Sequence, residues 1–139
     1  MAPSTSLPIG EDTRTTVLDA LPRTAFRNRR NMVPLSDAPD PGRYLELDDG
    51  DSGERVLLPL ADGTTHLGRG FAADVRLEDQ SVSRRHAILH LRAGGAARVL
   101  DDRSANGTFV NGRRVTEAEL ADGDVVVLGR VVLTYRAIG

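Results

Sequence analysis

Three short blocks of this sequence carry side chains that could bind an anion. They are residues 68–69 (Gly-Arg), residues 83–86 (Ser-Arg-Arg-His) and residues 106–112 (Asn-Gly-Thr-Phe-Val-Asn-Gly). Arginine offers a fork of N–H donors that matches phosphate oxygens, serine a hydroxyl donor, and asparagine an amide that can bond to peptide backbone. None of these groups is a nucleophile with an adjacent general base to activate it. The blocks therefore favour recognition of a phosphorylated partner over catalysis, and we expect no enzyme activity.

The elements that must position these blocks are predicted to be short strands. From residue 43 onward, short runs rich in Val and Leu are bounded by Asp-Gly, Gly-Gly or Asn-Gly pairs, which are typical of hairpin turns. The runs cover residues 44–47, 55–60, 66–68, 74–77, 86–91, 97–100, 108–110, 124–128 and 131–135. Residues 117–121 form the one plausible helical turn in this region. The pattern predicts an all-β, antiparallel β-sandwich around a single core.

Composition limits the class of protein further. A chain of 139 residues with 40% apolar content is long enough for one domain with a real core. It has no cysteine, so disulfides and thiolate metal sites are ruled out and a reducing compartment is favoured. No signal peptide and no apolar run of about eighteen residues is present, so we expect a cytoplasmic protein with no membrane partner. A net charge of −2 argues against strong nonspecific nucleic-acid binding.

The first 42 residues differ from the rest and are predicted to be a flexible tail. They hold six of the seven prolines, and their five arginines are balanced by five acidic residues. Only residues 15–21 and 23–32 could form brief helical turns, which are marginal in water at such lengths. We therefore expect two parts: a tail over residues 1–42 and a domain over residues 43–139.

The three blocks, in this order and at this spacing, resemble the signature of the forkhead-associated (FHA) domain. The resemblance covers roughly the last hundred residues of the chain. It implies an eleven-stranded β-sandwich that binds phosphothreonine peptides through loops at one end and uses no metal and no cofactor. The expected partners are phosphothreonine-containing proteins and a Ser/Thr protein kinase.

The resemblance also implies a role for individual residues. Arg69 corresponds to the phosphate-contacting arginine, and Ser83 to the hydroxyl that donates to the same phosphate. Arg84 occupies a position that touches phosphate or peptide, and Asn106 corresponds to the residue that holds the peptide main chain. His86 corresponds to a structural histidine that braces the loops. The candidate binding set is therefore Arg69, Ser83, Arg84 and Asn106.

Plainer interpretations exist for the same residues. Arg69 could form a solvated salt bridge, and Ser83 and Asn106 could be turn residues that bond to their own backbone. The whole domain could be a phosphate-independent protein-interaction scaffold, and a nucleic-acid binder is a third alternative. A metal site is not expected, because His86 and His90 would lie ~13 Å apart along a strand with no third ligand nearby.

The tail carries a hypothesis of its own. Thr15 and Thr16, followed by Val17 and Leu18, resemble the paired-threonine phosphosite in the tails of small bacterial FHA regulators of metabolism. A kinase can bind such a segment when it is extended. We therefore predict phosphorylation at Thr15 or Thr16, with Thr15 narrowly favoured, and binding of the phosphorylated tail to its own domain. The alternative is that these threonines are merely polar residues of a tail.

Overall fold

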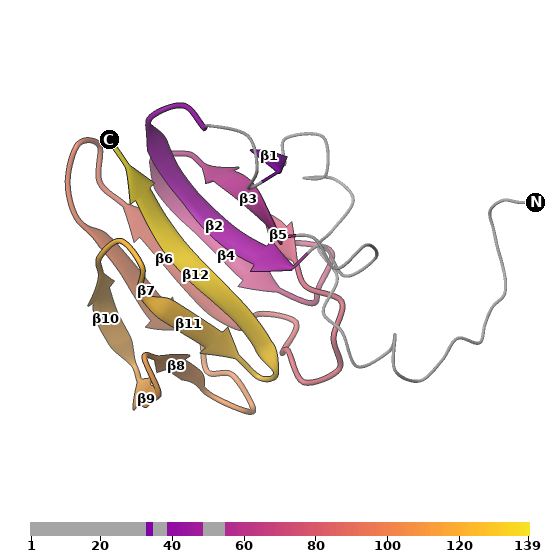
Figure 1. Cartoon of the computed structure of the whole chain (residues 1–139). Helices are drawn as coiled ribbons and strands as arrows, with labels where there is room; N and C mark the ends of the chain where they lie inside the picture. The colour runs from indigo at the N-terminus through magenta and orange to yellow at the C-terminus, as the bar shows by residue number, and fades with distance from the viewer. Residues whose placement is uncertain (1–32, 35–38, 49–54) are drawn as a thin grey trace, which may run out of the picture.

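The computed structural model describes residues 33–34, 39–48 and 55–139, which form two packed sheets (Figure 1). The strands are β1 (Val33–Pro34), β2 (Gly42–Asp48), β3 (Arg55–Leu60), β4 (Gly63–Gly68), β5 (Val75–Arg76), β6 (Ala87–Leu91), β7 (Ala97–Asp101), β8 (Thr108–Val110), β9 (Arg113–Val115), β10 (Glu117–Leu120), β11 (Val125–Leu128) and β12 (Val131–Ile138). The predicted all-β class is confirmed, and β2 to β12 are the eleven strands that the resemblance implied. The described residues contain no helix that is long and apolar enough to cross a bilayer.

The two sheets have seven and five strands. The seven-stranded sheet has the order β1-β3-β2-β12-β11-β8-β9, and the five-stranded sheet has the order β10-β7-β6-β4-β5. In Figure 1 the broad strands β2, β12 and β11 lie over β4, β6 and β7. The prediction of a purely antiparallel sandwich needs one correction, because β5 pairs with β4 in parallel. The loop 69–74 returns the chain to the edge of β4, so that β5 runs in the same direction.

The core lies between the sheets, and strands such as β6 and β12 bury alternate side chains in it. In β6, the side chains of Ala87, Leu89 and Leu91 are buried in the core, while the side chain of His90 is exposed. The same alternation in β12 buries Leu133 but leaves Val132 exposed. Since successive side chains of a strand point to opposite faces, each inner face contributes every second residue to one shared core. This packing fixes the strand ends from which the loops emerge.

The expected helical turn at residues 117–121 is wrong. Residues 117–120 form strand β10, which pairs with β7 from Glu117 opposite Leu100 to Leu120 opposite Ala97. Leu120 is buried while Glu119 is exposed, which is the two-residue period of a strand. Glu, Ala and Leu favour helix, but burial of Leu120 and pairing with β7 outweigh that preference. The brief turns expected at residues 15–21 and 23–32 lie outside the described residues.

A hairpin connects β8 and β9, as the Asn-Gly pair predicts. Asn111 and Gly112 both have positive φ, at 50° and 85°. Two consecutive residues with positive φ are required by the tight turn whose twist matches that of the flanking strands, and Asn-Gly is the pair that accepts it. The side chain of Asn111 also accepts a hydrogen bond from the N–H of Val125 at 2.9 Å, which ties the turn to β11.

Strand β1 lies within residues 1–42, the predicted tail. Val33 pairs with Leu57, and Pro34 pairs with Val56, in an antiparallel ladder at the edge of the seven-stranded sheet. The boundary between residues 42 and 43 stays a prediction. This ladder nevertheless places Val33, ten residues before residue 43, in contact with the sheet.

Candidate functional site

The three sequence blocks gather at one end of the sandwich. Leu67 lies opposite Ala87, and Ala87 lies opposite Asp101, so the loops 69–74, 77–86 and 102–107 leave the five-stranded sheet at the same end. In the other sheet Leu128 lies opposite Thr108, which brings the turn between β11 and β12 to this end as well (Figure 1). We call this region the loop end.

Arg69 is oriented by its backbone and by one side-chain nitrogen. Its backbone N–H donates to the carbonyl oxygen of Ser83 at 2.9 Å, and its Nε–H donates to the carbonyl oxygen of Val82 at 2.9 Å. No carboxylate of the described residues forms an ion pair with this guanidinium. The half-buried side chain is thus held in place while its four terminal N–H donors are left for a ligand.

Gly68 allows two loops to approach each other. A Cβ atom at this position would overlap the backbone carbonyl of Arg84. The N–H of Gly70 donates to that same carbonyl oxygen at 3.1 Å. Because only glycine has no Cβ, the Gly-Arg pair of the first block has a steric cause. It brings Arg69 against the segment that carries Ser83.

Ser83 retains a hydroxyl donor. Its Oγ accepts a hydrogen bond from the backbone N–H of Ala105 at 2.9 Å. A serine hydroxyl has one donor and two acceptor positions, so this contact leaves the O–H free to donate to a ligand. The same bond links the loop 77–86 to the loop 102–107. Ser83 therefore lies where the second and third blocks meet.

His86 braces these two loops and is fully buried. Its Nδ1 accepts a hydrogen bond from the backbone N–H of Ser83 at 3.0 Å. The ring is therefore the tautomer with hydrogen on Nε2, and Nε2–H donates to the carbonyl oxygen of Gly107 at 2.9 Å. With both nitrogens used internally, His86 has the bracing contacts that the resemblance implied for it.

Asn106 is exposed, and its amide is held in one orientation. Its Nδ2 donates to the carbonyl oxygen of Ser81 at 2.8 Å. One N–H and the carboxamide oxygen are left for another partner. An acceptor and a donor at this position match the N–H and C=O groups of a peptide backbone. That Asn106 binds a peptide main chain stays a prediction.

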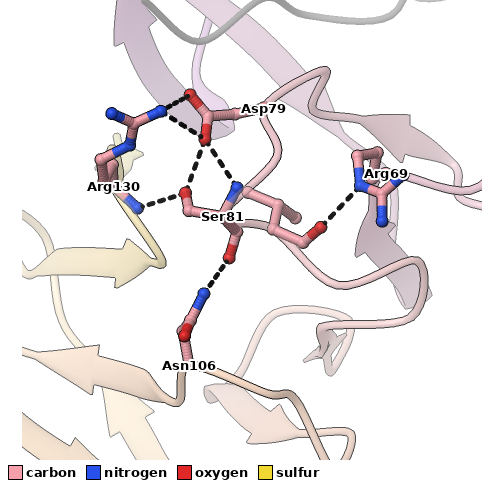
Figure 2. A network of polar contacts seen from close by, with 6 residues as sticks. Arg69, Asp79, Ser81, Asn106 and Arg130 are labelled. Atoms are coloured by element: carbon pink, nitrogen blue, oxygen red, sulfur yellow. Dashed lines mark hydrogen bonds and ion pairs between the residues drawn. The ribbon is translucent and has the colours of Figure 1, made fainter. Parts of the chain in front are cut away.

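Arg69 and Asn106 are anchored to adjacent residues of one segment. Figure 2 shows them approaching it from different sides, Arg69 at the carbonyl of Val82 and Asn106 at the carbonyl of Ser81. The separation of these two ligand-binding candidates therefore depends on how rigidly the segment 79–82 is held.

Asp79 and Arg130 hold that segment (Figure 2). The Asp79 carboxylate, which is buried, accepts hydrogen bonds from the N–H of Ser81 at 2.9 Å and from its hydroxyl at 2.6 Å. The N–H of Arg130 donates to Ser81 Oγ at 2.8 Å, and its guanidinium lies 3.4 Å from Asp79. Burial alone would raise the pKa of Asp79, but the hydrogen bonds from Ser81 and the charge of Arg130 outweigh burial and lower it.

A second aspartate holds the loop that carries Asn106. The carboxylate of Asp101 accepts hydrogen bonds from the hydroxyls of Ser104 at 2.5 Å and Thr108 at 2.7 Å, and from the N–H of Ser104 at 3.2 Å. Ser104 Oγ in turn accepts from the N–H of Gly107 at 2.9 Å. Burial would raise the pKa of Asp101, but these hydrogen bonds lower it. The loops 77–86 and 102–107 are therefore each held by one charged carboxylate.

A groove of about 810 Å³ lies beside this arrangement and is lined by Arg69 and Arg84. Neither Ser83 nor Asn106 lines it, so the groove extends from the site on the side of the loop 69–74. The Arg84 side chain is exposed, and no carboxylate of the described part of the chain forms an ion pair with it. The four predicted residues thus share the loop end, with two cations on the groove and two neutral groups beside it.

Sequence reasoning did not find Asp79, Ser81, Asp101 or Arg130. One signal was present, because an aspartate two residues before a serine is the pattern of a turn in which the side chain bonds to the backbone. Arg130 is 51 residues from Asp79, and no local pattern connects positions so far apart. Thr15 and Thr16, the predicted phosphorylation sites, lie outside the described residues.

The fold and the loop end define a class of protein: a β-sandwich recognition domain whose end loops carry arginine, hydroxyl and amide groups. Comparison with known proteins gives the family. A family model described as the FHA domain matches residues 65–129. The chain belongs to the FHA family, which confirms the resemblance found in the sequence.

Three relatives illustrate the similarity. The FHA domain-containing protein FhaA of Mycobacterium tuberculosis is 46% identical over 93 residues, which are 66% of this chain and 17% of FhaA. The glycogen accumulation regulator GarA of Mycolicibacterium smegmatis is 44% identical over 84 residues, which are 60% of this chain and 51% of GarA. A solved structure from work on phosphothreonine-dependent FHA domain interactions is 41% identical with a TM-score of 0.62, covering 70% of this chain and 97% of that one. The chain thus spans about half the length of GarA and a smaller part of FhaA.

Proposed function

We propose that this chain is a non-enzymatic module that binds phosphothreonine peptides in a Ser/Thr kinase pathway. The observation that carries the proposal is that the guanidinium of Arg69 is oriented but not neutralised. Its guanidinium is oriented by the Val82 carbonyl, has no carboxylate partner in the described part of the chain, and belongs to a loop bonded to Ser83. Membership of the FHA family, with a relative whose interactions are phosphothreonine-dependent, supports the same function.

Each site residue has a role in this proposal. Arg69 binds the phosphate dianion with two parallel charge-assisted N–H bonds, for which its planar fork is suited. Ser83 donates its hydroxyl to another phosphate oxygen. Arg84 adds a second positive charge from the groove side. Asn106 bonds to the main chain of the peptide, so that the phosphorylated residue is read within an extended segment.

Peptide titrations test the proposal against its alternatives. We expect phosphothreonine peptide to bind better than phosphoserine peptide, because the family resemblance implies a preference for the β-methyl group, and unphosphorylated peptide to bind barely at all. Equal binding of all three in a fluorescence titration would support the phosphate-independent scaffold instead. Binding to DNA or RNA that falls steeply with salt would support the nucleic-acid alternative.

We also propose that the tail supplies a ligand in cis after phosphorylation of Thr15 or Thr16. From Thr16 to Val33, where β1 meets the sheet, is 17 residues. The flexible linker that the composition predicts would have a root-mean-square span of ~23 Å and a contour length of ~60 Å. A domain of about a hundred residues is ~34 Å across. The linker is therefore long enough, and a tether of this length gives an effective concentration of about millimolar.

NMR on the phosphorylated chain tests the cis interaction. We expect phosphorylation to shift the amide signals of residues 68–70, 83–85 and 106 in a way that does not depend on protein concentration, and to weaken binding of an added phosphopeptide. Thr15→Ala and Thr16→Ala should identify the phosphosite, with Thr24→Ala as the matched control. Signals that stay unmoved, or that move only as concentration rises, would exclude a cis ligand while leaving binding of partner peptides intact.

A further inference from the structure

Phe71 is held in an exposed position beside the proposed phosphate site. It lies two residues after Arg69, in the loop 69–74, and its side chain is 84% exposed. The other exposed large apolar residue of the described chain is Val132, at 49%. A single exposed apolar side chain is common on protein surfaces. This one differs because it is packed on a neighbouring cation and borders a groove.

Arg76 holds the ring of Phe71. The guanidinium carbon of Arg76 lies 4.4 Å from the ring centroid, which is a cation–π contact. A terminal nitrogen of Arg76 lies 3.5 Å from the Glu78 carboxylate, and its Nε is buried without an acceptor among the described residues. The ring and Glu78 therefore orient the guanidinium. The ring in turn is restrained while most of its surface stays in contact with water.

The ring and the proposed phosphate site share one groove. Arg69, Arg84, Phe71, Arg76 and Glu78 all line the groove of about 810 Å³. The Cα atoms of Arg69 and Phe71 are at most ~7 Å apart, a distance that an extended peptide covers in two or three residues. A peptide whose phosphate is bound at Arg69 and whose main chain reaches Asn106 would therefore also be within reach of Phe71.

We propose that Phe71, packed on Arg76, is a second contact point that binds an apolar side chain of the phosphopeptide, aliphatic or aromatic, a few residues from the phosphothreonine. The proposal rests on the proposed phosphopeptide binding. A ring that is restrained before binding loses little conformational freedom when it is covered. Covering it removes apolar surface from water, which is the largest favourable term available at this position.

Two of the arginines that line the groove already have acidic partners. Arg76 is paired with Glu78, and Arg85, which lines the same groove, is paired with Asp102 at 3.2 Å. An acidic side chain placed against Phe71 would compete with the Glu78 carboxylate for Arg76. An apolar side chain meets the ring without breaking either ion pair.

A double-mutant cycle on the full chain tests this contact. Phosphothreonine peptides carrying Leu, Ala, Asp or phosphoserine at each flanking position are titrated calorimetrically against the unaltered chain and against Phe71→Ala. We expect one position at which Leu→Ala weakens binding by about tenfold in the unaltered chain and by less than about twofold in Phe71→Ala. Phe71→Tyr should keep the preference for Leu. Val132→Ala, the matched loss of an exposed apolar side chain outside the groove, should behave like the unaltered chain.

Three outcomes would overturn the proposed Phe71 contact, and only one of them would also overturn the proposed phosphothreonine binding. Equal effects of Leu→Ala in both proteins at every position would remove the Phe71 contact and leave phosphothreonine binding in place. Coupling of Phe71 to Asp or phosphoserine instead of Leu would replace it with an anion subsite at Arg76. Failure of every phosphopeptide to bind the unaltered chain would overturn this contact and the proposed function together.

Discussion

On the outer face of the seven-stranded sheet the Glu46 carboxylate binds two arginines, whereas at the loop end Asp79 and Asp101 bind mainly backbone N–H groups and hydroxyls. Glu46 accepts from Arg55 Nε at 2.7 Å and from Arg136 at 2.9 Å. Asp79 and Asp101 instead accept from Ser81, Ser104 and Thr108 at 2.5 to 3.2 Å. Among the described residues, the arginine paired with them is Arg130, which lies 3.4 Å from Asp79.

This difference determines which arginines can receive an anion. The charges of Arg55 and Arg136 are paired with the Glu46 carboxylate, and Arg136 is also paired with Asp122 at 3.0 Å. Arg69 is fixed by the Val82 carbonyl, which orients a guanidinium without neutralising it. A site that can bind an anion therefore has two requirements. The carboxylates that hold its loops must bond to N–H groups and hydroxyls instead of to the binding arginine, and that arginine must be oriented by a neutral acceptor.

The largest expected effect separates these two kinds of arginine. Arg69→Ala should weaken binding of a phosphothreonine peptide by about 1.5 to 3 kcal/mol or more, roughly tenfold or worse, because charge-assisted bonds to phosphate are lost. Arg55→Ala, the matched control on the sheet face, should leave that affinity unchanged and cost at most about 1 kcal/mol of stability. Calorimetry gives the affinities and thermal unfolding gives the stabilities. Unchanged affinity in a folded Arg69→Ala chain would refute the site.

The same comparison shows what the sequence can predict. Gly68-Arg69, Ser83 and the Asn106 run could be found because each forms a local block, and hairpins such as Asn111-Gly112 follow from backbone geometry that few residues accept. Contacts between distant positions could not be found, because they depend on sheet register. Leu120 shows the limit: its neighbours favour helix, and only the pairing of β10 with β7 makes the segment a strand.

Removing the charge of Asp79 should affect both stability and binding. Asp79→Asn keeps the shape of the side chain but loses its charged hydrogen bonds to Ser81, so we expect a stability loss of about 1.5 to 3 kcal/mol in urea unfolding. Phosphopeptide affinity should fall several-fold in the folded variant, because Arg69 and Asn106 are anchored to the segment that Asp79 holds. Glu46→Gln is the control, with reduced stability and unchanged affinity. If both variants retain full affinity, the loop does not need its carboxylate to position the site.

Loss of the Ser83 hydroxyl should have a smaller effect. Ser83→Ala removes one neutral donor to phosphate and one acceptor for the N–H of Ala105, each worth about 0.5 to 1.5 kcal/mol. We expect a phosphopeptide affinity lower by about three- to tenfold, measured by calorimetry. Ser83→Thr, which retains the hydroxyl, should bind more tightly than Ser83→Ala. An alanine variant that binds as well as the unaltered chain would restrict phosphate recognition to the arginines.

The smallest expected effect is that of pH on phosphopeptide affinity. It distinguishes titration of the phosphate on the ligand from titration of carboxylates in the protein. The pKa values of Glu46, Asp79 and Asp101 are lowered in the folded state. Their contribution to stability is therefore fully present above the usual carboxyl pKa of about 4 and is lost as pH falls through the lower folded values. The second ionisation of a phosphorylated side chain has a pKa of about 6.

Between pH 7 and pH 5 the phosphate becomes a monoanion while these three carboxylates keep their charge. Phosphopeptide affinity should then fall a few-fold, because Arg69 and Arg84 face one negative charge instead of two, and the phosphorus NMR signal of the peptide should titrate over the same range. The free chain should stay folded over this range, and protonation of the carboxylates should lower its thermal midpoint below about pH 4. Unfolding of the chain between pH 7 and pH 5, in step with the loss of affinity, would show that loss of the fold and not protonation of the phosphate is the cause.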